Sequence, residues 1–121
     1  MHSLGIDIIE IGRIEKAVER WGLRFLRRIY TKAELRLSRH KPSSLAARFA
    51  AKEAVMKALG TGVRGVGWRE IEILADHRGK PLVYLYGKAQ NRAEELGLDK
   101  LAVSLSDSRE YAVAFVIGET E

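Results

Sequence analysis

The chain has 121 residues, of which 46% are hydrophobic and 31% charged, as is typical of a single globular domain that folds in water. It has no cysteine, which excludes disulfide scaffolds, thiolate metal centres and thiol nucleophiles. The longest apolar run covers seven residues, 111–117, whereas a membrane-spanning helix needs about 20. The first residues lack the basic leader of a signal peptide. We therefore expect one domain, residues 1–121, in the cytoplasm and without a membrane partner.

The net charge of +5 is concentrated in one segment. Residues 13–41 hold ten basic and three acidic side chains, while the rest of the chain has a net charge of −2. A segment of this kind attracts an acidic partner, which would be nucleic acid, a phosphorylated ligand or an acidic protein. The alternative interpretation is the solvated face of a helix.

The first part of the chain predicts a strand followed by helices. Residues 4–9 alternate in side-chain direction, which favours a strand that carries Asp7 on one face. A helix is expected from about residue 11 to 29, where apolar and basic positions each recur every three or four residues, and Gly22 can break it. The basic positions of this helix are Arg13, Lys16, Arg20, Arg24 and Arg27.

Two further helices follow in the sequence. Thr31 and Glu34 have the spacing of a capping box, which predicts the start of a short helix. Ser43 or Ser44 is the expected N-cap of an alanine-rich helix over 45–59, which ends at the glycines that follow it.

The second half predicts a sheet with one helix. The expected strands cover 68–76, 82–86, 101–105 and 111–117, and the expected helix covers 88–96. Helices that gather early and strands that gather late favour an α+β fold over a doubly wound parallel sheet.

Two carboxylates lie in apolar surroundings. Asp7 belongs to a strand that is otherwise apolar, and Glu53 shares a helix face with Phe49, Met56 and Lys57. A carboxylate in such a place is costly unless it is paired or binds a cation. The alternatives are a salt-bridged aspartate near a strand end and an ordinary Glu53–Lys57 pair one helical turn apart.

Taken together, these residues predict a site for a metal and a phosphate. Two carboxylates from separate elements suit Mg²⁺, which is commonly held by one or two carboxylates and substrate phosphates. Lys57 and Arg48 are cations that suit a polyphosphate beside such a metal. Arg48 precedes Glu53 by five residues, so we expect it to flank the same site.

At these positions the sequence resembles the holo-acyl-carrier-protein synthase family, which are small 4′-phosphopantetheinyl transferases. The resemblance is carried by GIDIIEI at 5–11, RFAAKEA at 48–54 with KALGTG at 57–62, GKP at 79–81, and SLS at 104–106 with SREYA at 108–112. It implies the family's α+β fold, a small antiparallel sheet packed with helices in a single domain. It also implies an enzyme that transfers the 4′-phosphopantetheine arm of coenzyme A to a serine of an apo acyl carrier protein, releasing adenosine 3′,5′-bisphosphate, in support of fatty-acid biosynthesis.

The resemblance assigns roles to individual residues. The family's Mg²⁺ ligands correspond to Asp7 and Glu53, and Glu53, directly or through a water on the metal, is the candidate base. Lys57 corresponds to the catalytic lysine at the pyrophosphate of coenzyme A, and Arg48 to an arginine at its 3′-phosphate. The turn of Gly79, Lys80 and Pro81 corresponds to residues that border the adenine.

The resemblance also implies partners. Arg13, Arg20 and Arg24 are the expected docking residues for an acidic apo acyl carrier protein. A homotrimer is expected, with active sites between adjacent subunits. In one position the chain departs from the family, because Asp107 stands where a histidine is usual. Asp107 could leave phosphate binding to Arg48, approach the metal or act as a base.

Two other classes of function compete with this interpretation. A basic nucleic-acid-binding module would explain the positive segment, but zinc-finger spacing and aromatic-rich RNA-binding signatures are missing from the sequence. A trimer that binds a carrier protein without catalysis would explain Asp107. We expect an enzyme without a nucleic-acid partner.

Overall fold

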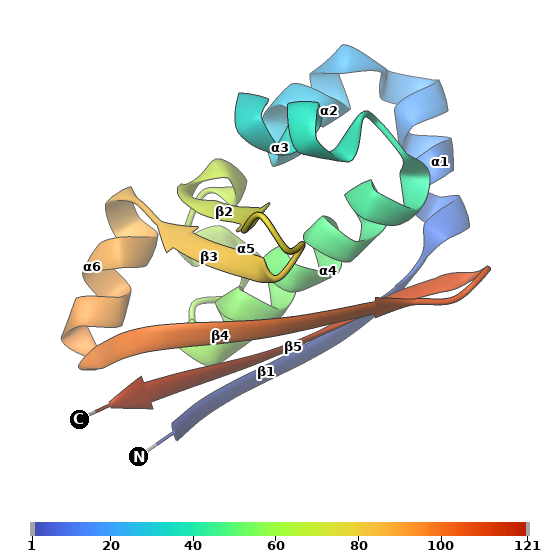
Figure 1. The fold of residues 1–121 in the computed structure, drawn as a ribbon. Coiled ribbons are helices and arrows are strands. Elements are labelled where there is room, and N and C mark those ends of the chain that lie inside the picture. The colour runs from blue at the N-terminus through green and yellow to red at the C-terminus, as the bar shows by residue number, and fades with distance from the viewer. Residues whose placement is uncertain (1, 121) are drawn as a thin grey trace.

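Three strands form an antiparallel sheet in the order β1–β5–β4 (Figure 1). A computed structural model describes residues 2–120. Strand β1 spans His2–Glu10, β4 spans Leu98–Asp107 and β5 spans Tyr111–Thr120. Strands β4 and β5 are longer than the sequence predicts, because they stay paired with each other beyond their apolar runs. The two edge strands come from opposite ends of the sequence, so the sheet joins the start of the chain to its end.

Helix α4 (Pro42–Leu59) lies across one face of this sheet and forms the centre of the core. It approaches β1 so closely that a Cβ atom at Gly5 would overlap the carbonyl oxygen of Ala54. The helix is lined with buried small residues, which are Ala46, Ala47, Ala50, Ala51, Ala54 and Ala58. Small side chains allow the helix and strand backbones to touch, and this contact sets the position of α4 on the sheet.

The predicted start of the long helix is wrong. The helix begins at Pro42, which occupies its first turn, and Lys41 is an N-cap without a side-chain hydrogen bond. Proline fits the first turn because it has no N–H to leave unpaired and its φ angle is already helical. Ser43 and Ser44 therefore lie inside the helix and do not cap it.

Three helices lie above α4 in Figure 1. They are α1 (Ile11–Trp21), α2 (Leu23–Ile29) and α3 (Lys32–Ser38). Gly22, at φ 55°, separates the first two, so the predicted break is confirmed. The predicted capping box is also confirmed, since the Thr31 side chain accepts from the Glu34 N–H and the Glu34 carboxylate accepts from the Thr31 N–H.

A hairpin and a helix complete the fold. The hairpin pairs β2 (Ile71–Ala75) with β3 (Pro81–Leu85), and α6 (Gly87–Glu95) follows it. The short α5 (Gly62–Gly65) and the 3₁₀ helix η1 (Trp68–Glu70), which the sequence did not predict, connect α4 to β2. The predicted strand starts three residues too early, because the Glu70 carboxylate accepts from the Gly67 N–H and closes a turn there. The fold is α+β, as expected.

The outer face of the three-stranded sheet carries apolar side chains. Leu4, Ile6 and Ile8 of β1 are 57–60% exposed, and Phe115 of β5 is 39% exposed. The strand register places Ile6 beside Phe115, so these residues form one continuous patch. In Figure 1 this face lies below the sheet, and no helix of residues 2–120 covers it. None of the helices in the described part of the chain is long and apolar enough to cross a membrane.

Candidate active site

The close contact between β1 and α4 brings the two predicted carboxylates together. Asp7 follows Gly5 by two residues, so its side chain points to the same inner face of the sheet. Glu53 precedes Ala54, whose carbonyl oxygen touches β1 at Gly5. The Asp7 side chain is 15% exposed and Glu53 is half-buried. The close packing of Gly5 against α4 thus places Asp7 and Glu53 next to each other.

Lys57 supplies a positive charge at this pair. Its Nζ atom lies 3.6 Å from Oδ1 of Asp7 and donates a 2.9 Å hydrogen bond to the carbonyl oxygen of Ile6. Lys57 thus forms its ion pair with Asp7 of β1. The alternative from the sequence was a pair between Lys57 and Glu53 within the helix. Lys57 is more than half exposed, so it can also reach a bound anion.

The surroundings of Glu53 raise its pKa from 4.5 to about 7. Burial has the largest effect, and the charge of Asp7 and a hydrogen bond with it add to the increase. Lys57 and Arg13 act in the opposite direction but do not cancel it. Lys57 and Arg13 therefore leave the negative charge of the carboxylate pair incompletely compensated.

This pair fits a magnesium ion. Oxygen donors suit Mg²⁺, which keeps several waters and takes further ligands from substrate phosphates. Residues 2–120 contain no cluster of three or more metal-ligating side chains, so a bound ion would need such additional ligands. The shortage of positive charge at Asp7 and Glu53 favours a cation there, and open coordination positions favour a phosphate substrate.

A depression of about 360 Å³ opens beside the carboxylates. It is lined by Asp7, Ile8, Ile9, Arg13, Ile14, Ala17, Phe25, Phe49 and Glu53. The rings of Phe25 and Phe49 stack with centroids 6.5 Å apart, and Phe49 also stacks on Trp68 at 4.7 Å. The structure therefore joins the predicted metal ligands to one predicted docking residue, Arg13, with an apolar wall between α1, α2 and α4.

Arg48 lies elsewhere. Five helical residues correspond to about 500° of rotation, so its side chain leaves α4 on a different side from that of Glu53. It lines a second and larger depression of about 780 Å³, together with Arg39, Lys41, Ser44 and Asp107. The expectation that Arg48 flanks the same site as Glu53 is wrong within one chain. The structure instead places Arg48 and Asp107 at one basic depression.

The Arg48 side chain is held firmly although its depression is open. It is only 8% exposed. Its Nε donates to the carbonyl oxygen of Ile73 at 2.9 Å, and its Nη1 donates to Oγ of Ser44 at 2.6 Å. Burial lowers its pKa, although Glu34 and Tyr30 oppose that effect. These hydrogen bonds fix the orientation of the guanidinium before an anion binds in the depression.

The predicted adenine-bordering turn is an exposed hairpin loop. Gly79 has φ 86°, a conformation that favours glycine. The Asp76 carboxylate closes the loop by accepting from the N–H groups of Arg78 and Lys80 at 2.8 and 3.0 Å. Lys80 follows in the loop and Pro81 begins β3, so the three predicted residues lie together where the hairpin turns from β2 into β3.

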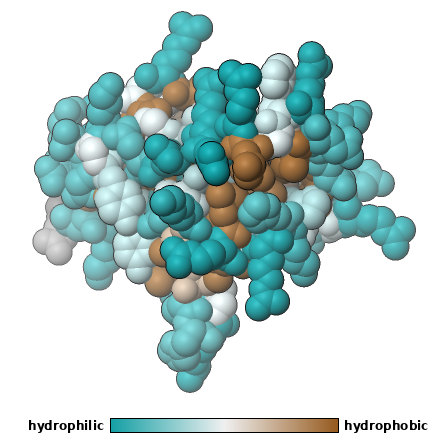
Figure 2. All heavy atoms as spheres, turned by 90° about the horizontal axis from the view of Figure 1, so that it is seen from above, coloured by the Kyte–Doolittle hydropathy of each residue, from teal (hydrophilic) through white to brown (hydrophobic). Residues whose placement is uncertain are grey.

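The predicted docking arginines lie along α1 and α2. Arg13, Arg20 and Arg24 are all exposed. The Arg20 guanidinium lies 5.0 Å from the centre of the Trp21 ring, and Arg24 shares a depression with Trp21, Phe25 and Arg28. Seen from the side of α1–α3, polar side chains surround a smaller hydrophobic area (Figure 2). This surface therefore combines positive charge with exposed aromatic rings.

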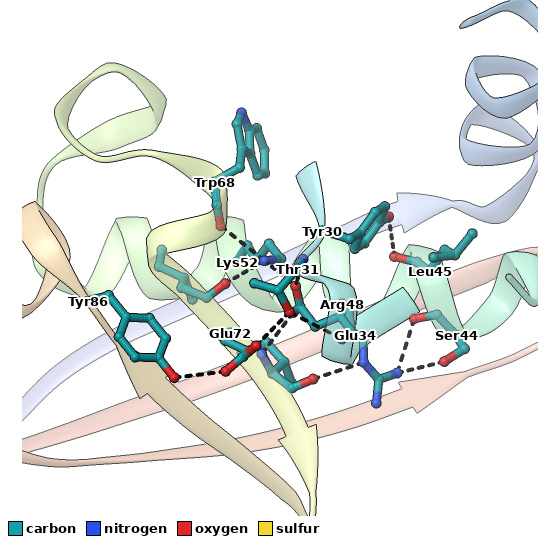
Figure 3. Close-up of polar contacts among 12 residues, drawn as sticks. Tyr30, Thr31, Glu34, Ser44, Leu45, Arg48, Lys52, Trp68, Glu72 and Tyr86 are labelled. Atoms are coloured by element: carbon teal, nitrogen blue, oxygen red, sulfur yellow. Dashed lines mark hydrogen bonds and ion pairs between the residues drawn. The ribbon is translucent and has the colours of Figure 1, made fainter. Parts of the chain in front are cut away.

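Sequence reasoning missed a buried polar network. The side chains of Glu34 and Lys52 are 0% exposed and form an ion pair of 2.8 Å (Figure 3). Burial lowers the pKa of Lys52, and the charge and hydrogen bond of Glu34 counteract this effect. The signal available was a lysine among the alanines of the long helix.

Comparisons with known proteins show the family of the chain. The 4′-phosphopantetheinyl transferase superfamily, in its ACPS family, matches residues 3–116. The holo-acyl-carrier-protein synthase of Herpetosiphon aurantiacus is 54% identical, over 94% of this chain and 95% of the relative, and that of Moorella thermoacetica is 49% identical, over 99% and 95%. The chain belongs to this family.

Solved structures show the same fold in holo-acyl-carrier-protein synthases. The Helicobacter pylori enzyme in complex with coenzyme A has a TM-score of 0.88 and 34% identity, with 96% of this chain and 99% of that one covered. The Bacillus anthracis enzyme in complex with coenzyme A (3′,5′-ADP) has a TM-score of 0.81 and 36% identity, over 98% and 96%. The chain is thus an enzyme that transfers the phosphopantetheine arm of coenzyme A to an apo acyl carrier protein.

Proposed function

We propose that Asp7 and Glu53 hold the Mg²⁺ ion of this phosphopantetheinyl transfer. The observation that carries the proposal is the pair of adjacent, partly buried carboxylates, where burial and then the charge of Asp7 raise the pKa of Glu53 to about 7. A divalent ion removes this repulsion. When bound, the ion supplies positive charge to the pyrophosphate of coenzyme A and helps to orient it.

The chain's own residues account for the remaining steps. Lys57, held by Asp7 and the Ile6 carbonyl, provides positive charge for the phosphate that leaves. Glu53 is the candidate base for the hydroxyl proton of the carrier serine, because its carboxylate lines the same depression as the proposed docking residue Arg13. The apolar wall of Phe25 and Phe49 restricts water around the attacking group.

The second depression is the proposed site for the 3′-phosphate of coenzyme A. Arg39, Lys41 and Arg48 provide three positive charges there. The 79–81 turn is proposed to border the adenine. Coenzyme A carries phosphates at two separate places, and the molecule offers two separate regions for them. The two regions belong to one active site if a neighbouring subunit closes the gap between them.

The proposed docking surface for the carrier protein is the basic face of α1 and α2. Arg13 lies in the same depression as Glu53, so a carrier bound along Arg13, Arg20 and Arg24 would present its serine near the carboxylates. Opposite charges on the two proteins accelerate the encounter and fix its orientation. An acidic carrier protein suits this surface better than nucleic acid does, because Glu15 and Glu19 interrupt the basic residues.

A homotrimer is proposed from the outer face of the sheet. Leu4, Ile6, Ile8 and Phe115 form an exposed apolar patch on β1 and β5. Exposed apolar patches of this kind mark protein–protein interfaces. Burial of this patch against neighbouring copies would bring site residues of adjacent subunits close together.

Intact-protein mass spectrometry tests the proposed metal site. The protein is incubated with coenzyme A, Mg²⁺ and an apo acyl carrier protein, and a matched sample contains EDTA. We expect the carrier to gain one phosphopantetheine only without EDTA. Asp7→Asn and Glu53→Gln should each lower the rate on the order of 100-fold.

Asp99→Asn is the matched control, because it removes an exposed carboxylate of β4 outside the site. Its rate should equal that of the unaltered protein. Full activity of either site variant, in a sample whose circular dichroism shows native structure, would contradict the metal assignment.

A further inference from the structure

Strand β2 pairs with β3 on one edge only, and its other edge faces α3 and α4. In an antiparallel pair, backbone groups point alternately toward the partner strand and away from it. The C=O of Ile71 and both backbone groups of Ile73 point away from β3. Because this edge is buried, these groups would be costly if they had no hydrogen-bond partners.

Charged side chains take the place of a neighbouring strand at this edge (Figure 3). Nζ of Lys52 donates to the Ile71 carbonyl oxygen. The Ile73 N–H donates to Oε2 of Glu34 at 2.8 Å, and Nε of Arg48 donates to the Ile73 carbonyl oxygen at 2.9 Å. Three side chains from two helices therefore dock the hairpin through its backbone.

The Glu34–Lys52 pair holds this arrangement together. Lys52 uses its three ammonium protons on Glu34, on the Trp68 carbonyl oxygen at 3.0 Å and on Ile71. Oε1 of Glu34 also accepts from the Thr31 N–H at 2.8 Å. All three ammonium protons are used and both carboxylate oxygens accept, so a small rotation of α4 against β2 would break several hydrogen bonds at once.

The docked edge lies between the two proposed parts of the coenzyme A site. Lys52 is the neighbour of Glu53 on α4. The backbone N–H and C=O of Ile73 link Glu34 to Arg48, and the same strand leads to the 79–81 turn. Any shift of the hairpin against α4 therefore moves the turn, and the Arg48 side chain that is anchored on Ile73, relative to the carboxylates.

We propose that Lys52 and Glu34 are positioning residues for coenzyme A, which fix Arg48 and the 79–81 turn relative to Glu53. They do so by docking the inner edge of β2 on α4, without touching the substrate. This inference rests on the proposed function, in which Arg48 and the turn bind coenzyme A.

Steady-state kinetics of Lys52→Met tests the role. We expect the KM for coenzyme A to rise at least tenfold, the KM for the carrier protein to stay within twofold and kcat to stay within threefold. A purely structural role gives a different result, because a partly unfolded sample contains less active enzyme, which lowers kcat and leaves KM unchanged. An unchanged KM for coenzyme A would overturn the proposal.

Glu34→Gln is the second variant, for the case that Lys52→Met does not fold as judged by circular dichroism. It keeps the side-chain volume and an oxygen for the Ile73 N–H, but it removes the ion pair. For this variant too, an unchanged KM for coenzyme A would overturn the proposal. Tyr86→Phe is the matched control, because it removes the 2.8 Å hydrogen bond to Glu72 and leaves the hydrogen bonds of Ile71 and Ile73 intact. Its KM should stay within twofold.

Arg48→Ala separates the two levels of the argument. A higher KM for coenzyme A in Arg48→Ala, without any increase in Lys52→Met, would overturn the positioning role alone. An unchanged KM in Arg48→Ala would contradict the proposed coenzyme A site instead, whatever Lys52→Met shows.

Discussion

At the scale of single residues, Glu53 keeps a proton at pH values where an ordinary glutamate has lost it. Burial and Asp7 are the main causes, and the pKa reaches about 7. The unfolded chain releases this proton near pH 4.5. Between these values the folded protein holds one more proton than the unfolded chain, so the free energy of unfolding falls as pH rises through this range.

We therefore expect the metal-free protein to lose stability between about pH 5 and 8. Urea denaturation in EDTA at several pH values measures this loss, and Glu53→Gln should remove that part of the slope. Mg²⁺ should restore stability most at the high end, where both carboxylates are charged. An identical pH slope for the variant and the unaltered protein would contradict the assignment.

Asp107 is the residue that the sequence left without a role. The structure places it in the depression of Arg39, Lys41 and Arg48, away from Asp7 and Glu53. A role at the metal or as the base within one chain therefore receives no support from the geometry. A carboxylate among these cations weakens their attraction for a phosphate.

We expect Asp107→His to lower the KM for coenzyme A by about fivefold, from a charge effect on the order of 1 kcal/mol. The kinetic comparison uses Asp99→His as its control, on the same strand but outside the depression. If both variants keep the original KM, position 107 does not affect coenzyme A.

At the scale of elements, the contact between α4 and β1 creates the carboxylate pair. The local signals for the elements were readable in the sequence: alternation in β1, the break at Gly22 and the capping box at Thr31. The start of α4 was not, because two serines offered a plausible cap and Pro42 at the first turn took precedence. Local patterns identify elements, whereas their ends depend on competing capping arrangements.

Gly5→Ala should push α4 away from β1. Its Cβ would overlap the Ala54 carbonyl oxygen, which the backbone cannot easily avoid. We expect a loss of about 1–3 kcal/mol in unfolding free energy by urea denaturation and weaker Mg²⁺ binding by calorimetry.

Gly12→Ala is the control for this variant, because a Cβ at Gly12 in α1 meets no atom within 4 Å. It should be neutral or stabilise the protein by up to about 1 kcal/mol. Equal stability of the two alanine variants would show that the close contact at Gly5 does not position the helix.

At the scale of the whole molecule, one face of the sheet is covered by α4 and the other exposes an apolar patch. If this patch is the trimer interface, a charge in its centre should prevent assembly. We expect Ile6→Lys and Phe115→Lys to give smaller species in analytical ultracentrifugation, with unchanged circular dichroism and lower activity.

Leu23→Lys is the control for assembly, because this leucine is 56% exposed on α2, away from the sheet. It should assemble like the unaltered protein. A monomeric unaltered protein at micromolar concentration would contradict the proposed trimer.

The sequence by itself was enough to predict the two carboxylates of the proposed metal site. Asp7 and Glu53 stand out because a charge in an apolar pattern needs a reason, and this reasoning requires only neighbouring residues. The tertiary structure decided that Arg48 faces a separate depression beside Asp107. It also decided that Lys52 and Glu34, 18 positions apart, join in the core, and that Glu34 binds Ile73, 39 positions away. Such partners depend on how helices and strands pack, and the local pattern contains no information on that packing.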